Sequence, residues 1–557
     1  MKMSKHQKAA SLPGRVAPMC GADIELANFI VGEQQVGGTG YEASRALLAE
    51  IKGLPIRQNA YYLDSGWSAP AAATVPRIGG NTGAATYASS SGWGYNLQDV
   101  GRRFLPGNSG AAYIDLDHCE LCIPEVLSVF DHVAAWHAML RIARSALDSA
   151  NEGRHPDRRI QVLVNNTDGL GHSYGSHVSC LISRRTFENI FWRKPHYLQF
   201  LASLQVSSIL LTGQGKVGSE NGQSYTPYQI SQRADFFETL QGVQTTFNRP
   251  IVNARDEALC GRGGIQDPAT PARLHVIFYD SSLAHGSCLM RAALTQMAAT
   301  LLEAGLVNPR LILDDPLAAV QSFSHDPSLK AKAAMINGQR LTALELQCGF
   351  LDEVKRHAAR GVFEGIVPRY EEIIALWEDT LNKFTEGDLM ALAPRLDWVM
   401  KLMAIERAME QSSTLDWDSP EIKMIDHLYS SLDDNGLYRA YEASGFAEQL
   451  IPAERTDYFT ENPPEDTRAW TRAMLLRRAL SDDVEVESVD WDRITFRVPG
   501  RYAWKSYRTF EMANPLGFTQ ADAQPIFDSC PDFGDLLDGL ESLALDDAFP
   551  ADAIAVN

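Results

Sequence analysis

The sequence has no run of about 18 apolar residues, the length that a membrane-spanning helix requires. The basic N-terminus is not followed by an apolar region of signal-peptide length. The chain has only 8 cysteines, scattered over 557 residues, which suits reduced thiols better than a disulfide framework. Cys119 and Cys122 form a C-x-x-C, but no second pair has zinc-site spacing. We therefore expect a cytoplasmic protein without a membrane segment or a thiolate metal site.

Positive charge is also scarce. Lys and Arg number 50 against 70 Asp and Glu, so the net charge is −20. A nucleic-acid-binding surface needs clustered cations, so this composition argues against one but leaves room for a locally basic groove. The 45% hydrophobic and 22% charged contents are those of an ordinary globular protein.

The chain is longer than the roughly 250–300 residues at which one hydrophobic core stops growing. We predict a flexible extension over 1–18, a large domain over 19–454 and a small α+β domain with an acidic tail over 455–557. Residues 37–110 are rich in Gly, Ala, Ser and Asn, which predicts a long loop insertion without long regular elements. Loops of that size are usually functional or disordered.

Hydrophobic periodicity predicts the main elements. Apolar residues spaced by three and four from Val126 onward indicate an amphipathic helix that covers a sheet. The other predicted strands lie at 20–32, 159–164, 206–212, 273–280 and 491–498, and the other predicted helices at 287–306, 342–360, 366–384 and 396–411.

Two acidic segments are candidate metal or catalytic sites. Asp23 and Glu25 would share one strand face, where such a pair could hold Mg²⁺, although an exposed acidic face is the plainer alternative. Asp115 and Asp117 would share a face if their strand is regular, with Glu120 just beyond. A carboxylate beside metal and phosphate can act as base or nucleophile, but a surface strand end is the alternative.

A polar, glycine-broken loop, Asn165 to His177, follows an apolar strand and is typical of an active-site loop. Arg233 and Arg255 carry the planar fork that grips phosphate or an oxyanion. His275 could instead be a satisfied core histidine, and Arg468 could form an ordinary surface ion pair.

Matching motifs occur in the same order over roughly residues 20–515, and together they resemble the Pup ligase and Pup deamidase/depupylase family. The resemblance implies an α+β, glutamine-synthetase-like fold, in which a curved antiparallel sheet is packed by helices. It implies ATP, or ADP with phosphate, and Mg²⁺ as cofactors, and a Pup-like modifier and its conjugates as partners. The matching segments are those at 21–25, 115–125, 165–177, 229–233, 253–257, 273–277, 396–398, 436–438 and 461–468.

Site residues carry over by position. Asp115 matches the family's catalytic aspartate, and Arg233, Arg255 and Arg468 match arginines that bind phosphate and stabilise an anionic intermediate. The implied metal and nucleotide-phosphate site consists of Asp23, Glu25, Glu120, His177 and His275.

Three positions depart from the family pattern. Asp23 replaces a glutamate and shortens a ligand's reach by one methylene. Val178, with Ser179 and Cys180, stands where Glu-Asn-Tyr is typical, and His285 stands where a glutamate is expected. The last two changes are expected to remove acids close to the site.

The long insertion between Glu25 and Asp115 favours the deamidase/depupylase branch, whose members carry an extra loop there. The predicted activity is hydrolysis of the side-chain amide or isopeptide bond at the C-terminal Glu or Gln of the modifier. The alternatives are ATP-dependent ligation of the modifier to a lysine, a non-catalytic homologue, and a carboxylate-amine ligase with a smaller substrate.

Overall fold

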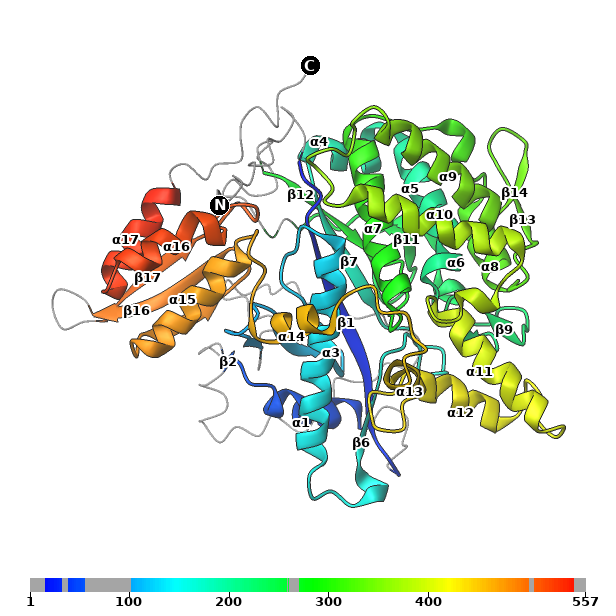
Figure 1. The fold of residues 1–557 in the computed structure, drawn as a ribbon, viewed down its shortest axis with the longest axis horizontal. Helices are drawn as coiled ribbons and strands as arrows, with labels where there is room; N and C mark the ends of the chain where they lie inside the picture. The colour runs from blue at the N-terminus through cyan, green and yellow to red at the C-terminus, as the bar shows by residue number, and fades with distance from the viewer. Residues whose placement is uncertain are drawn as a thin grey trace, which may run out of the picture.

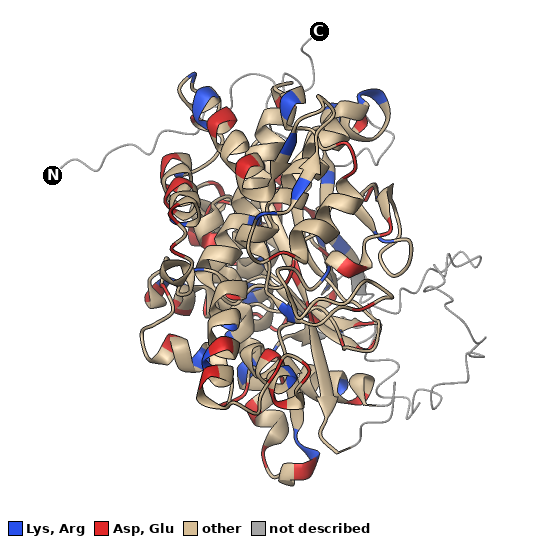
Figure 2. Ribbon diagram, turned by 90° about the vertical axis from the view of Figure 1, so that its right-hand side faces the viewer, with Lys and Arg blue, Asp and Glu red and all other residues tan. Residues whose placement is uncertain are grey.

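The computed structural model describes residues 16–32, 39–55, 102–257, 259, 270–499 and 505–544. Helices and mainly antiparallel strands are mixed along the chain, so the predicted α+β class is confirmed. Figure 1 shows a central sheet with a large helical layer on one side and a smaller sheet with its own helices on the other. Acidic and basic residues are interspersed over the described elements in Figure 2.

The central sheet has the strand order β12-β7-β1-β5-β4-β3-β2, and β6 pairs with the end of β1. Every pairing in it is antiparallel. Its strands are β1 (Cys20–Ile30), β2 (Leu54–Pro55), β3 (Arg103–Phe104), β4 (Ala111–Asp115), β5 (His118–Cys122), β6 (Ile160–Leu163), β7 (Ser176–Ile182) and β12 (Ala272–Val276).

Three helices cover one face of this sheet: α1 (Gly40–Glu50), α3 (Val129–Asn151) and α7 (His285–Glu303). Side chains alternate between the two faces of a strand, so Ile24, Leu26 and Val178 point to the helices and are fully buried. The large core forms between this face and the helices. It leaves the opposite face for polar residues.

Most of the remaining helices belong to the large helical layer beside the central sheet. The predicted helices over 287–306, 342–360, 366–384 and 396–411 are present. They correspond to α7, α9 (Ala343–Ala358), α10 (Tyr370–Glu386) and α11 (Asp397–Gln411). The other elements of this part are α4 (Arg184–Glu188), α5 (Pro195–Ser207), α6 (Ile209–Thr212), β8 (Lys216–Val217), β9 (Tyr228–Gln229), β10 (Thr239–Gly242), β11 (Pro250–Asn253), α8 (Pro316–Ser324), β13 (Lys332–Ala334), β14 (Arg340–Thr342), α12 (Pro420–Tyr429), α13 (Leu437–Ala443) and α14 (Ala453–Glu461).

Near the C-terminus a three-stranded sheet packs against three helices. Its core includes Phe496 and Phe510, and it also takes in Phe104 and Tyr113 from the central sheet. The predicted boundary at 455 stays a prediction, and the acidic tail beyond 544 lies outside the described residues. The elements are α15 (Ala469–Ser481), β15 (Glu485–Val489), β16 (Arg493–Pro499), β17 (Lys505–Glu511), α16 (Gln520–Ser529) and α17 (Phe533–Ala544).

Two predictions about elements were wrong. The segment 206–212 is not a strand, because its residues end α5 and form α6. A short apolar run that is buried on all sides has no periodicity to distinguish the two structures. The segment 37–110 does contain a regular helix, α1, whose buried Ala43 and Leu47 pack on the sheet. Residues 56–101 of that segment and 1–15 of the predicted extension lie outside the described residues.

Among the described residues, no helix combines the length and the hydropathy needed to cross a bilayer.

Candidate active site

The polar face of the central sheet gathers most of the predicted site residues. Asp23 and Glu25 alternate with buried apolar residues along β1, as predicted. Asp23 pairs with His177 on β7, and Glu25 pairs with Glu120 on β5. Directly paired residues point to the same face, so these four side chains lie together. We call Asp23, Glu25, Asp115, Glu120, His177 and His275 the strand-face site.

The second acidic segment is a hairpin, which corrects the prediction of one regular strand. β4 ends at Asp115 and β5 begins at His118, and the two residues between them, Leu116 and Asp117, both have positive φ, 48° and 87°. Such a pair is the geometry of a two-residue hairpin turn. Asp117 therefore lies in the turn and does not share a strand face with Asp115. The hairpin instead places Asp115 and Glu120 on neighbouring strands beside Glu25.

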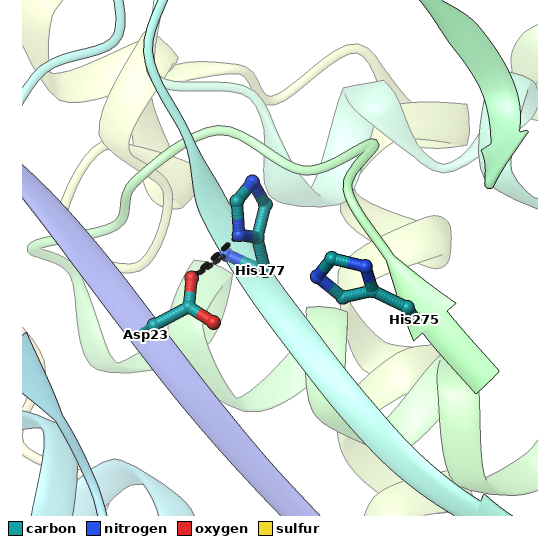
Figure 3. A group of neighbouring side chains, drawn as sticks. All are labelled: Asp23, His177 and His275. Atoms are coloured by element: carbon teal, nitrogen blue, oxygen red, sulfur yellow. Dashed lines mark hydrogen bonds and ion pairs between the residues drawn. The ribbon is translucent and has the colours of Figure 1, made fainter. Parts of the chain in front are cut away.

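The strand-face site contains two groups of possible ligands. Oxygen atoms of Glu25, Asp115 and Glu120 lie within 4.8 Å of one another, and the same holds for ligand atoms of Asp23, His177 and His275. In the second group, His177 Nδ1 is 2.7 Å from Asp23 Oδ1 and the two imidazole rings are 5.0 Å apart. Figure 3 shows Asp23 and His177 facing each other from adjacent strands, with His275 beside them.

The electrostatics of the two groups differ. Burial raises the pKa of the Glu120 carboxyl well above its ordinary value, and the neighbouring charges of Asp23, Glu25 and Asp115 raise it further. Burial also opposes ionisation of Asp23, but the charge and hydrogen bond of His177, with Arg273, hold its pKa below the usual value. Burial lowers the pKa of His275, as do Arg273 and His177, so this imidazole is neutral and able to coordinate a metal.

These residues fit a divalent cation. Carboxylate oxygens are the ligands that Mg²⁺ prefers, and Glu25, Asp115 and Glu120 offer one each within 4.8 Å of one another. His275 Nδ1 is also buried without a hydrogen-bond partner. A bound cation would satisfy the imidazole and remove the repulsion among the acids.

A glycine in the loop of 165–175 packs directly against this site. The Gly175 N–H donates to Glu25 Oε2 over 2.6 Å. A Cβ at Gly175 would lie 2.1 Å from His177 Nε2, so only glycine fits there. The loop is also anchored to the residues at 216–220, because the Thr167 hydroxyl donates a hydrogen bond to Glu220, which forms an ion pair with Lys216. This anchoring fits the prediction that the loop contributes to the site.

The predicted arginines occupy different places. Arg233 is 1% exposed, its Nη1 donates to the Tyr174 carbonyl, and its buried Nε has no partner among the described residues. Burial lowers its pKa, while the charges of Glu25, Asp280 and Asp23 raise it. Arg255 is half-buried, with its Nε 3.7 Å from a Glu257 oxygen.

Arg468 lies at the border between the central sheet and the C-terminal elements. It is 2% exposed, and its Nε donates to Glu125 Oε1 over 2.8 Å. Its two terminal nitrogens donate to backbone carbonyls of Met512 and Leu259. A cavity of about 360 Å³ beside it is lined by residues that include Asp23, Tyr113, Glu125, Arg273, Arg468 and Trp491. The proposed phosphate role of Arg468 stays a prediction.

Sequence reasoning missed two further arginines and a tyrosine. Arg273 precedes His275 by two residues on β12, and its charge acts on Asp23 and His275. Tyr113 likewise precedes Asp115 by two residues on β4, and its hydroxyl donates a hydrogen bond to Glu120. The alternation of strand residues could have found both. Arg249, whose pKa is lowered by burial and by the charge of Arg233, follows a loop and had no such signal.

Val178 and His285 are not on the polar face, which corrects the expectation that these departures remove acids close to the site. Ser179, by contrast, shares the face of His177 and lies opposite His275. Val178 lies between His177 and Ser179 and therefore points to the helical face, where it is fully buried. His285 begins α7 and lies beside His137 of α3, with the ring centroids 4.4 Å apart. Only the exchange at Asp23 changes a side chain of the strand-face site.

Comparisons with known proteins agree with this fold. The family profile described as Pup-ligase protein matches residues 73–495. The chain is 33% identical over 436 residues to a Pup deamidase/depupylase of Mycolicibacterium smegmatis, which covers 78% of this chain and 82% of that protein. It is 31% identical over 429 residues to a depupylase of Acidothermus cellulolyticus, covering 76% and 80%. It is 32% identical over 394 residues to a Pup–protein ligase of Kribbella flavida, covering 69% and 82%.

Two solved structures share the fold. The complex between Pup and its ligase PafA has a TM-score of 0.72 at 20% identity and covers 97% of this chain and 96% of that one. PafA in complex with ADP has a TM-score of 0.66 at 22% identity and covers 82% and 91%. Fold and similarity together define a family of enzymes that includes both depupylases and ligases. The chain belongs to the Pup-ligase protein family, so the resemblance seen in the sequence is confirmed.

Proposed function

We propose that this chain is a hydrolase that cleaves the side-chain amide or isopeptide bond at the C-terminal Glu or Gln of a Pup-like modifier. The relatives named depupylase and Pup deamidase/depupylase, with identities of 31–33%, support this assignment. Ligases of 30–32% identity support the same modifier but the opposite direction of reaction.

The connection between β2 and β3 is the observation that favours hydrolysis. These strands are hydrogen-bonded neighbours, with Leu54 opposite Phe104, yet residues 56–102 separate them. A hairpin connection needs only about 2–5 residues, so a long insertion starts from the edge of the sheet that carries Asp115. An insertion at this place is the sequence feature that favours the deamidase/depupylase branch.

Asp115 is the proposed catalytic residue. It lies at the end of β4 within the carboxylate group of the strand-face site. As base it would take a proton from water, or as nucleophile it would attack the carbonyl carbon itself. On the base route the deprotonated water attacks the carbonyl carbon and the C–N bond breaks. On the nucleophile route the C–N bond breaks to leave an anhydride with Asp115, which water then hydrolyses. On both routes the amine leaves with a proton, and the water oxygen becomes part of the free carboxylate of the modifier. We propose that Arg233 and Arg255 stabilise the negative charge that develops on the carbonyl oxygen.

We propose ATP, or ADP with phosphate, and Mg²⁺ as cofactors. Asp23, Glu25, Glu120, His177 and His275 would hold the metal and Arg233, Arg255, His275 and Arg468 the nucleotide phosphates. When bound, the metal supplies positive charge that polarises an oxygen of the substrate or phosphate. The complex of PafA with ADP supports nucleotide binding on this fold.

ATP-dependent ligation is the second candidate, because the solved structures that share this fold are of the ligase PafA. The deciding experiment incubates the pure protein with a Pup-like conjugate, with free modifier, and with or without ATP. The hydrolase releases modifier without net ATP consumption. Stoichiometric ATP hydrolysis coupled to new isopeptide bonds would establish the ligase instead.

A further inference from the structure

A second group of possible metal ligands lies away from the strand-face site, on three helices. His137 belongs to α3, His285 begins α7, and Glu442 lies on α13. One ligand atom from each lies within 4.8 Å of the other two. The proposed hydrolysis uses none of these residues.

The imidazole rings of His137 and His285 are buried, and each has a ring nitrogen without a hydrogen-bond partner among the described residues. His137 is 8% exposed and His285 is 2% exposed. His137 Nε2 and His285 Nδ1 are both buried and have no hydrogen-bond partner among the described residues. Buried polar groups are nearly always paired, so two orphaned nitrogens in neighbouring rings point to a bound ion or water.

The lowered pKa values of both rings favour neutral imidazole, which can bind a metal ion. Burial lowers the pKa of His137, and the charges of His285, Arg141 and Arg291 lower it further. Burial and Arg141 lower the pKa of His285 to about 4, against the opposing effect of Glu448. Both rings are therefore neutral near pH 7, and neutral imidazole is the form that binds metals.

Two arginines that act on this group, Arg141 and Arg439, are each paired with an acid outside it. The charge of Arg141 acts on both rings, and Arg141 forms an ion pair with Asp457. Arg439, which also acts on Glu442, is paired with Asp434. Glu442 is the one acidic residue of the group; burial raises the pKa of its carboxyl, whereas the charges of Arg141 and Arg439 lower it.

We propose that His137, His285 and Glu442 bind one zinc-type divalent cation that ties α3, α7 and α13 together. Two imidazole nitrogens and a carboxylate oxygen are ligands of zinc and its neighbours in the first transition row, whereas Mg²⁺ requires oxygen ligands. Ligand atoms in a tetrahedral zinc site are about 3.4 Å apart for bonds of about 2.1 Å, so atoms that lie within 4.8 Å of one another need to approach by no more than about 1.4 Å. Glu442 is partly exposed and can make that movement. Water takes the fourth position.

The test must separate this group from the strand-face site, which also offers two imidazoles and a carboxylate. We would strip the full-length protein with a chelator, add excess Mg²⁺ and ADP, and titrate it with Zn²⁺, counting bound metal by mass spectrometry. His285→Gln and Glu442→Gln are each expected to bind one equivalent less than the unaltered protein. Glu442→Gln changes a partly exposed residue, so it reports even if the buried variant folds poorly.

His357→Gln is the matched control, because His357 is a buried histidine outside the group, bonded to Glu353. Its zinc stoichiometry should equal that of the unaltered protein. Co²⁺ in place of zinc should give a visible absorption band that His285→Gln removes. Equal zinc binding by the unaltered protein and both group variants would overturn the proposal, as would an equal loss in His357→Gln.

Discussion

Two buried glutamates, five residues apart in the chain, occupy opposite electrostatic environments. Glu125 accepts from Arg468 Nε over 2.8 Å and from Arg472 Nη2 over 2.6 Å. Burial opposes its ionisation, but these two arginines hold its pKa at about 2. Glu120 has Asp23, Glu25 and Asp115 as its charged neighbours, and burial with their repulsion raises its pKa. The difference shows that the fold surrounds Glu125 with cations of its own, whereas the charges that act on Glu120 are those of other acids.

The ion pairs of Glu125 have a structural task. Arg472 also donates to the backbone carbonyls of Ser109 and Trp491, and both arginines are fully buried. Glu125 follows β5, while Arg468 and Arg472 belong to the start of α15. The ion pairs therefore join the central sheet to the C-terminal elements.

The largest expected effect is on catalysis. Asp115→Asn keeps the shape of the side chain but removes the base or nucleophile, so turnover of a conjugate should fall by roughly 10²–10⁴-fold. Single-turnover assays measure this loss, and nucleotide binding should survive. Asp117→Asn is the control, because asparagine tolerates the positive φ of this turn residue. Near-normal activity in Asp115→Asn would exclude Asp115 as the catalytic residue.

Breaking the ion pairs of Glu125 should cost stability. Glu125→Gln leaves two buried arginines without their carboxylate, and such a loss costs about 3–5 kcal/mol of unfolding free energy. Urea denaturation measures it. Glu238→Gln, at an exposed glutamate, should stay within about 0.5 kcal/mol of the unaltered protein. A small effect at Glu125 would mean that the comparison with Glu120 does not hold.

The same pair gives stability a defined dependence on pH. The pKa of Glu125 is about 2 in the folded protein and 4.5 ordinarily, so its contribution is fully present above pH 4.5 and is lost as the pH falls towards 2. The shift corresponds to roughly 3 kcal/mol. Denaturation curves between pH 5 and pH 3 should therefore show a steeper loss in the unaltered protein than in Glu125→Gln. If the unfolding free energies of the unaltered protein and of Glu125→Gln fell equally between pH 5 and pH 3, the predicted contribution of Glu125 would be contradicted.

Filling the strand-face site should stabilise the fold by mass action. MgATP or MgADP at about 100–1,000 times the dissociation constant adds about 2–4 kcal/mol. Thermal unfolding with and without ligand measures the effect. Gly175→Ala should abolish it, since the new methyl group would collide with His177, whereas Gly242→Ala meets only ordinary contacts. The absence of any shift in the unaltered protein would refute nucleotide binding.

The smallest effect is expected at Glu120 itself. Without divalent cations at pH 7, Glu120→Gln should change the unfolding free energy by less than about 1 kcal/mol, because the amide still accepts from Tyr113 and removes a repelled charge. With MgADP the variant should lose most of the stabilisation by ligand. A loss as large as that of Glu125→Gln would remove the distinction between the two glutamates.

The sequence alone predicted the face that carries the site, because strand alternation is a local property. Asp23 and Glu25 follow this rule, and the family resemblance supplied their partners on other strands. The hairpin at Leu116 and Asp117 was not predictable from turn chemistry, since neither residue is a glycine or asparagine. The apolar run at 206–212 has no period to read, and its helical form follows from burial on all sides. Arg249 reaches Arg233 only through tertiary folding.

The shared face of the strand-face site also limits how such a protein can diverge. Its ligands come from five antiparallel strands, and a shift of one residue in any of them turns every side chain beyond it to the helical face. A single inserted codon within β1 or β7 would therefore bury a ligand among the helices and bring an aliphatic residue into the site. Length changes are tolerated only between strands, as at residues 56–102, so gene variants that gain or lose sequence there can alter access to the site and leave its chemistry intact.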